Sequence, residues 1–122
     1  MRLGVMILAA LLSGAAVAAS AQPVADAALV QKGADAFRDN CAGCHLDVIA
    51  PSLNGVVGRK IAGGSDFDYS AALKAKGGTW TDANLDAWLT NSQAFAPGSS
   101  MVMAVPDPAT RAALIAYLKT LK

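Results

Sequence analysis

The sequence predicts a small all-α domain with long loops, and three observations support this prediction. No stretch alternates apolar and polar residues for long enough to indicate a β-strand. Several stretches instead repeat apolar residues every three or four positions, and capping residues precede the clearest of them. Two segments that contain Gly and Pro, 50–64 and 94–105, separate these stretches and are expected to be loops.

The first expected helix ends near Asn40. One face of it carries residues spaced three or four positions apart, namely Val30, Gly33, Phe37 and Cys41. Residues 22–28, which come before this pattern, are expected to form an irregular N-terminal lead-in. The second expected helix is short, covers residues 70–76 and is closed by Gly77 and Gly78, because glycine suits the left-handed conformation of a C-terminal cap.

Two further helices have clear start signals. Thr81 is expected to cap a helix that runs to about Asn91, with an apolar stripe made of Leu85, Trp88 and Leu89. The last helix is expected to begin after Asp107, with Pro108 in its first position, where proline is well tolerated. Its apolar face consists of Leu114, Tyr117, Leu118 and Leu121.

Residues 1–21 have the composition of an export signal. Arg2 is the only charged residue before Asp26, an apolar run follows it, and small residues lead to an A-x-A-like site at Ala19 and Ala21. We expect cleavage after Ala21, which leaves residues 22–122 as a mature domain outside the cytoplasm, in a bacterial periplasm. The alternative is an uncleaved membrane anchor, but the strongly apolar run is shorter than the ~20 residues that a spanning helix needs.

The mature chain is close to electrically neutral. Residues 22–122 contain 9 Lys and Arg, 9 Asp and no Glu, which argues against a nucleic-acid-binding protein and against a strongly cationic membrane-surface protein. These 101 residues include nine Gly and several long loops, so few side chains remain to build a core. Small domains of this kind usually need a disulfide, a metal or a cofactor.

Cys41, Cys44 and His45 form the motif C-x-x-C-H, which is typical of covalent haem attachment. Two thiols at this spacing add to the two vinyl groups of one haem, and the adjoining histidine then ligates the iron. Three alternatives remain: a dithiol redox pair, a structural disulfide and half of a zinc site. The dithiol fold requires a βαβ pattern that is not visible, and no further Cys or His exists to complete a zinc site.

The sixth ligand of the iron is open at this point. His45 is the only histidine, so two histidine ligands from one chain are excluded. The candidates are Met101, Met103, a lysine or no protein ligand at all. Both methionines follow Pro97 and Gly98 in one irregular loop, and they are the only methionines after residue 21. We therefore expect one of them to bind the iron, because a thioether ligand is common in haem proteins that carry electrons.

From about Leu29 to Lys122 the chain resembles a small class I cytochrome c. The resemblance rests on Gly33, Phe37, Cys41, Cys44 and His45, on the segment 50–60 (APSLNGVVGRK), and on Phe67, Tyr69, Ser70 and Trp80. It implies the cytochrome c fold, with four to five helices and long loops wrapped around one covalently attached haem c. It also implies that Leu114 and Tyr117 of the last helix pack on Gly33 and Phe37.

The resemblance also implies roles for haem-pocket residues. The carbonyl of Pro51 would accept a hydrogen bond from Nδ1 of His45, the proximal ligand, and so fix the tautomer of the ring. Arg59, Tyr69 and Trp80 would hold a buried haem propionate.

On the distal side, the ligand loop resembles P-G-T-K-M, which selects Met101 as the axial ligand and leaves Met103 as the fallback. Asn91 would orient the methionine sulfur. The chain departs from the family pattern at Trp88, where a tyrosine is common, at Ser92, which replaces a proline, and at Ser100, which replaces a lysine.

We expect a monomeric one-electron carrier that cycles between Fe(III) and Fe(II) and is not an enzyme. Its partners would be redox proteins, such as a membrane respiratory complex, an oxidase or a periplasmic dehydrogenase, with no nucleic acid and no stable membrane insertion. One alternative is a gas-binding or weakly peroxidatic haem protein with a labile sixth ligand. Another is a stable subunit of a larger oxidoreductase, which an exposed apolar patch at Phe95, Val102 or Val105 would favour.

Overall fold

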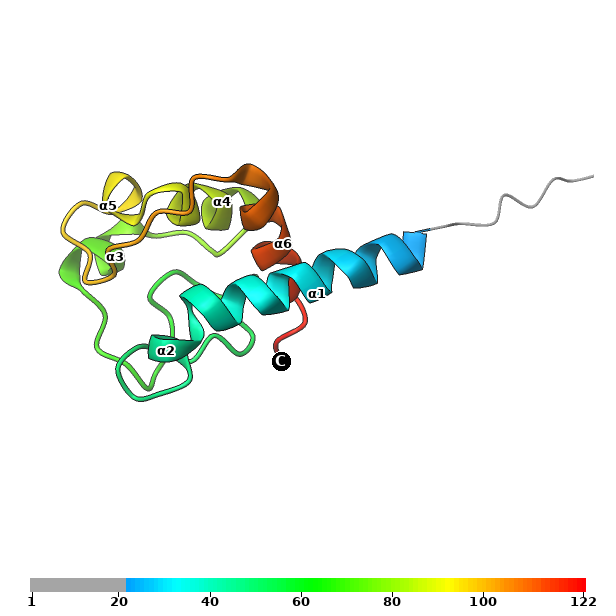
Figure 1. Cartoon of the computed structure of the whole chain (residues 1–122). Coiled ribbons are helices and arrows are strands. Elements are labelled where there is room, and N and C mark those ends of the chain that lie inside the picture. Colours follow the sequence, from blue (N-terminus) through cyan, green and yellow to red (C-terminus); the bar gives the residue numbers. More distant parts are fainter. Residues whose placement is uncertain (1–21) are drawn as a thin grey trace, which may run out of the picture.

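The computed structural model describes residues 22–122, and in this part of the chain all regular structure is helical (Figure 1). The helices are α1 (Gln22–Asn40), α2 (Ala42–His45), α3 (Ala71–Lys76), α4 (Asp82–Thr90), α5 (Ser92–Phe95) and α6 (Pro108–Leu118). Within residues 22–122 the only β-type pairing outside helices is an isolated bridge between Lys60 and Thr79. The all-α prediction is confirmed, whereas the expected export signal lies in residues 1–21, outside the described residues.

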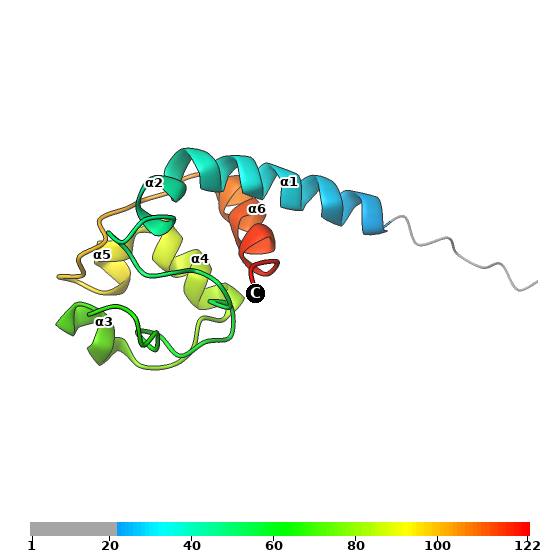
Figure 2. The same ribbon diagram turned by 90° about the horizontal axis from the view of Figure 1, so that it is seen from below.

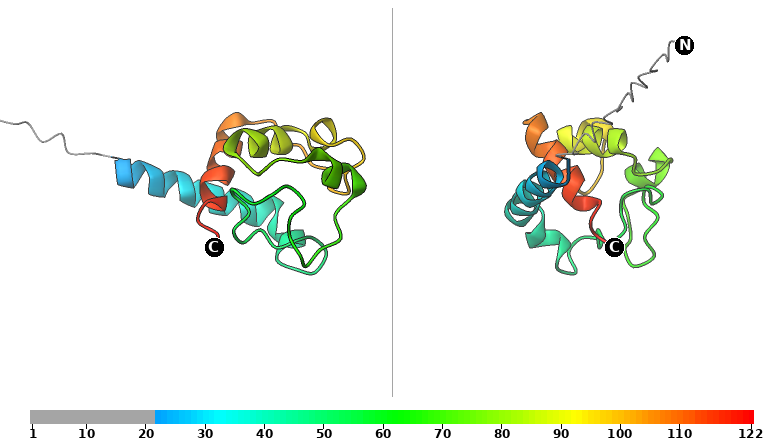
Figure 3. Two further views of the ribbon diagram at one scale, coloured as in Figure 1. Left: turned by 180° about the vertical axis from the view of Figure 1, so that it is seen from behind. Right: turned by 90° about the vertical axis from the view of Figure 1, so that its right-hand side faces the viewer.

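Helix α1 ends at Asn40 as predicted but begins at Gln22, so the expectation of an irregular lead-in at 22–28 is wrong. The segment is rich in alanine, the strongest helix former, and Pro23 stands in the first turn, where its missing N–H costs nothing. Figure 3 shows from behind that the N-terminal half of α1 runs beyond the other elements. Among the described residues, no helix is long and apolar enough to cross a membrane.

The two predicted start signals act as caps: side-chain oxygens accept hydrogen bonds from main-chain N–H groups at α4 (Thr81 from Asn84, 3.1 Å) and α6 (Asp107 from Thr110, 2.9 Å). Ser70, expected inside the second helix, is instead the N-cap of α3 and accepts from the N–H of Leu73 at 3.3 Å. The hydroxyl and N–H of Thr110 hold the pKa of Asp107 below its usual range. A carboxyl group with a lowered pKa stabilises the fold above its ordinary pKa, so this cap is intact at neutral pH and weakens only in acid.

Helices α1 and α6 cross in close contact at Gly33 (Figure 2). A Cβ atom at position 33 would overlap the carbonyl oxygen of Ala113 and would lie 2.7 Å from Cβ of Tyr117. One turn further along, the rings of Phe37 and Tyr117 pack with their centroids 5.1 Å apart, as the sequence predicted. The crossing fixes the C-terminal end of α1, from which the Cys41 segment continues.

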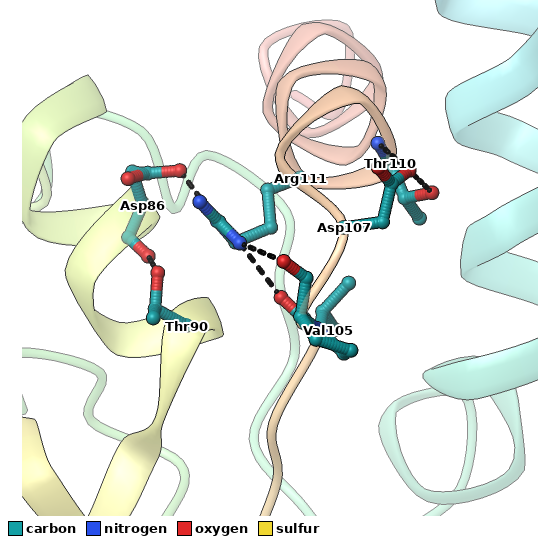
Figure 4. Close-up of polar contacts among 7 residues, drawn as sticks. Asp86, Thr90, Val105, Asp107, Thr110 and Arg111 are labelled. Atoms are coloured by element: carbon teal, nitrogen blue, oxygen red, sulfur yellow. Dashed lines mark hydrogen bonds and ion pairs between the residues drawn. The ribbon is translucent and has the colours of Figure 1, made fainter.

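Arg111 ties α6 to α4 and to the loop before α6 (Figure 4). Its Nε donates to a carboxylate oxygen of Asp86 at 2.7 Å, and its Nη1 lies 2.9 Å from the carbonyl oxygens of Val105 and Pro106. The Arg111 side chain is only 11% exposed, so this ion pair is shielded from solvent on the arginine side. The loop that carries both methionines is therefore anchored at its C-terminal end.

Replacing Gly33 with alanine should destabilise the holoprotein by about 2 to 3 kcal/mol, because the new methyl group forces α1 and α6 apart. Denaturant unfolding followed by circular dichroism measures the change. Lys32→Ala, which alters the exposed neighbour, is the control and should leave the free energy of unfolding unchanged. Equal stability of Gly33→Ala and the wild type would contradict the close crossing.

Candidate functional site

A cavity of about 420 Å³ occupies the centre of the domain. The C-terminal end of α1, α2, α3, α4, α6 and the loops around residues 49–59 and 99–103 all contribute to its wall. Most of the lining side chains are apolar, among them Phe37, Leu53, Leu73, Trp88, Leu89 and Leu114. This size falls in the range of small-molecule and cofactor sites.

The C-x-x-C-H motif begins at Cys41, between α1 and α2, and its other four residues form α2. The N–H of Cys41 still bonds the carbonyl of Phe37 at 2.8 Å, and the N–H of His45 bonds the carbonyl of Cys41 at 3.0 Å. This single turn brings all three motif side chains to the cavity wall. The structure therefore assembles two thiols and one imidazole at the edge of an apolar space, which is the arrangement that covalent haem attachment requires.

The thiols do not have the character of a dithiol redox pair. Burial, and to a smaller extent the nearby Cys44, raise the pKa of the Cys41 thiol to about 11. Catalytic dithiols need the opposite shift, since the thiolate is the attacking species. The described residues also form no strand, so the βαβ frame of such enzymes is missing there.

Pro51 holds the imidazole of His45. Nδ1 of His45 lies 2.8 Å from the carbonyl oxygen of Pro51. A carbonyl only accepts, so Nδ1 carries the proton and Nε2 keeps the free lone pair that a metal ligand needs. The geometry thus agrees with the role that the resemblance implies for these two residues.

Arg59, Tyr69 and Trp80 all line the cavity, and two of them bring unpaired polar atoms. Arg59 spends its terminal nitrogens on the carbonyls of Ser52 (3.1 Å) and Asn54 (3.3 Å), but its Nε is buried with no partner. The hydroxyl of Tyr69 is likewise buried with no partner. Unpaired buried donors are costly, so these two atoms fit a carboxylate of a bound group such as a haem propionate.

Met101, Val102 and Met103 all line the cavity, but both methionines are half-buried while Val102 is 79% exposed. The methionine side chains are therefore the more enclosed part of this stretch of the wall. The structure therefore brings both candidate sulfur ligands to the site. The choice between them stays a prediction.

Asn91 lies elsewhere. It is exposed, is absent from the cavity wall, and uses its Oδ1 to accept from the N–H groups of Gln93 and Ala94, both at 3.0 Å. It is the N-cap of α5 through Oδ1, while an effect on a methionine sulfur would need its amide N–H group, so the expectation that Asn91 orients the sulfur stays a prediction. An N-cap asparagine has its acceptor fully engaged by the helix start.

Sequence reasoning missed Ser92, Gln93 and Ser99, which hold the methionine loop. Ser92 is fully buried and Ser99 is 6% exposed, and their hydroxyls bond the main chain of that loop. No periodic pattern marks α5, because a four-residue helix is too short to produce one. One signal could have pointed to Ser92. It stands shortly before the methionine loop, at a position where the pattern of the resembling family has a proline.

The comparison with known families decides the identity of this fold. The family model described as Cytochrome c matches residues 30–122. The chain belongs to the cytochrome c family. Members of this family carry one covalently attached haem c, and the thiols, the imidazole and the two unpaired donors of this cytochrome c fit that group.

Individual relatives agree with this. A cytochrome c homolog from Bradyrhizobium diazoefficiens is 40% identical over 119 residues, covering 88% of this chain and 64% of its own length. A cytochrome c2 from Rhodomicrobium vannielii is 37% identical over 122 residues, covering 94% of this chain and 91% of its own. Among solved structures, cytochrome cH from Methylobacterium extorquens matches with a TM-score of 0.69 and 38% identity, covering 75% of this chain and 97% of that one.

Without haem, residues 22–122 should lose most of their helical circular dichroism signal, because an unfilled apolar cavity of about 420 Å³ removes the packing that a domain of this size needs. Apoprotein made in cells that lack haem attachment provides the sample, and holoprotein of the same sequence is the control. A cooperative unfolding transition of the apoprotein would contradict this prediction.

Proposed function

We propose that this cytochrome c is a one-electron carrier whose iron is held between His45 and Met101. The observation that carries the proposal is that Nδ1 of His45 is engaged by Pro51, which leaves Nε2 available on the wall of a cavity that Met101 also lines. The bound haem supplies the Fe(III)/Fe(II) couple, and a thioether ligand raises its potential by favouring Fe(II).

The protein side chains give the couple its setting. Cys41 and Cys44 would fix the group through thioether bonds, and Pro51 keeps the histidine in one tautomer and orientation. The unpaired Nε of Arg59 and hydroxyl of Tyr69 would donate hydrogen bonds to a propionate, whose charge the Arg59 guanidinium would neutralise, and the wall is largely apolar. Side chains held in this way should move little between Fe(III) and Fe(II), which favours fast electron transfer over a reaction that makes or breaks bonds.

The proposal does not include catalysis. In this proposal the only histidine of the chain binds the iron through Nε2 and donates its Nδ1 proton to Pro51, so neither ring nitrogen is left to exchange a proton with a substrate. Asp66 and Asp68 lie in a loop, and Asp68 is paired with Lys74 at 2.8 Å. We therefore assign no acid–base role to any side chain of this cavity.

We propose that the mature protein is residues 22–122, released by cleavage after Ala21 and located in the periplasm as a monomer. The charge pattern of residues 1–21 and the small residues at Ala19 and Ala21 support export.

A redox partner protein is proposed to dock where the cavity meets the surface. Large apolar side chains are exposed in the segment that follows α2, where Leu46 is 77%, Val48 93% and Ile49 65% exposed, and in the methionine loop, where Val102 is 79% exposed. Ile49 and Val102 also line the cavity, so this apolar rim (Leu46, Val48, Ile49 and Val102) borders the proposed haem site. Of the other residues considered for a patch, Val105 is buried and Phe95 is half-buried.

Met101→Ala should open the sixth coordination position, so the reduced protein should bind carbon monoxide at neutral pH, whereas the wild type should not. The variant should also lower the reduction potential by at least about 0.1 V, a modest part of the ~0.8 V range that axial ligands span. Optical spectra with and without carbon monoxide, and a redox titration, measure both effects.

Met103→Ala is the matched control for this experiment and should behave like the wild type. If Met103→Ala is the variant that binds carbon monoxide, then Met103 is the ligand. If the wild type itself forms the complex, the sixth position is labile and the gas-binding alternative replaces the carrier proposal.

Docking through the apolar rim should depend little on salt. The electron self-exchange rate between oxidised and reduced copies should change less than about threefold between roughly 0.01 M and 0.5 M salt, since the rim is apolar and residues 22–122 are close to neutral. Nuclear magnetic resonance line broadening measures this rate. Val48→Lys should slow the exchange at low salt and recover as salt is added; a steep salt dependence in the wild type would refute docking through the rim.

A further inference from the structure

The first residue of α5 is bonded to the methionine loop on both sides of Val102. The hydroxyl of Ser92 donates to the carbonyl of Met101 at 2.7 Å and accepts from the N–H of Met103 at 2.9 Å. The main-chain N–H of Ser92 donates to the carbonyl of Met103 at 3.0 Å. One fully buried serine therefore brackets the segment that carries both sulfur candidates.

Two further donors converge on the carbonyl oxygen of Met101. The side-chain amide of Gln93 lies 3.0 Å from it and the hydroxyl of Ser99 lies 3.1 Å from it. The same Gln93 side chain accepts from the N–H of Gly98 at 3.2 Å through its oxygen. Because a carbonyl has two lone pairs, this oxygen is saturated with partners, and of the three donors Ser92 is the nearest.

These bonds matter because the loop has no regular structure of its own. Residues 97–106 form neither helix nor strand, so their main-chain groups depend on outside partners. The bonds to Ser92 exist only while the loop lies against α5, and they are lost when it swings away from the cavity. Bonds made in only one of two states shift the equilibrium toward that state.

We propose that Ser92 is a positioning residue that holds the loop closed and so keeps the sulfur of Met101 on the iron. The inference rests on the proposed function, in which Met101 is the axial ligand. Ser92 itself touches only main-chain atoms of the loop, and its effect reaches the metal through the placement of Met101.

Imidazole binding to the oxidised holoprotein tests this inference, since imidazole competes with the methionine sulfur for the iron. Ser92→Ala removes both side-chain bonds and should bind imidazole about tenfold more tightly than the wild type, as expected when the N–H of Met103 is left without its acceptor only in the closed state. The absorption band of the methionine–Fe(III) bond should weaken in parallel. Spectrophotometric titration measures both.

Thr81→Ala is the matched control. It also removes a hydroxyl that bonds the main chain at a helix start, but Thr81 lies on α4 and does not line the cavity. It should lower the stability of the protein and leave the imidazole affinity unchanged. Equal imidazole affinity of Ser92→Ala and the wild type, with the methionine band intact, would overturn the proposal.

Met101→Ala separates a failure of this inference from a failure of the proposed function. If Met101→Ala binds imidazole no more tightly than the wild type, Met101 is not the ligand and the proposed function fails first. If Met101→Ala binds tightly while Ser92→Ala does not, only the positioning role is wrong.

A second variant covers the case in which Ser92→Ala does not fold. Gln93→Met removes another donor to the Met101 carbonyl at a half-buried position and should also tighten imidazole binding. Unchanged imidazole affinity of Gln93→Met would then overturn the proposal.

Discussion

The interior of this domain is an apolar cavity that its own side chains leave open, and this constraint decides where the other elements lie. Helices α1 and α6 cross at Gly33 so closely that one methyl group would separate them, and this crossing sets the wall from which the C-x-x-C-H turn starts. Elsewhere in the domain, α5 and Arg111 hold the methionine loop against this cavity. The haem c that members of the family carry would fill this space and complete the core of residues 22–122.

The polar groups around the cavity divide into those that are already satisfied and those that wait for a ligand. Nδ1 of His45 and the carbonyl of Met101 have partners from the protein. Nε of Arg59 and the hydroxyl of Tyr69 have none. The satisfied groups fix the orientation of side chains that would meet the iron, while the unsatisfied groups provide hydrogen bonds for the charged edge of the cofactor.

Much of the fold could be predicted from the sequence, because its signals are local. Thr81 and Asp107 mark helix starts through chemistry confined to one turn, and the spacing of Gly33 and Phe37 marks the face that meets α6. The start of α1 at Gln22 was not predicted, because an alanine-rich stretch of helix carries no apolar stripe. The capping role of Asn91 could not be predicted, because a one-turn helix such as α5 leaves no pattern in the sequence. The bonds of Ser92 could not be predicted either, because its partners lie about ten residues further along the chain and meet it only in the folded protein.

The alternation of Met101, Val102 and Met103 has a consequence for how such a protein changes over generations. These adjacent residues are under different structural constraints, since the two methionines are half-buried and Val102 is 79% exposed. Under the proposed function, a replacement at 102 would change mainly the surface offered to a partner protein, whereas a replacement at 101 would change the ligand of the iron. Partner recognition and redox chemistry would then be adjustable separately within three consecutive residues.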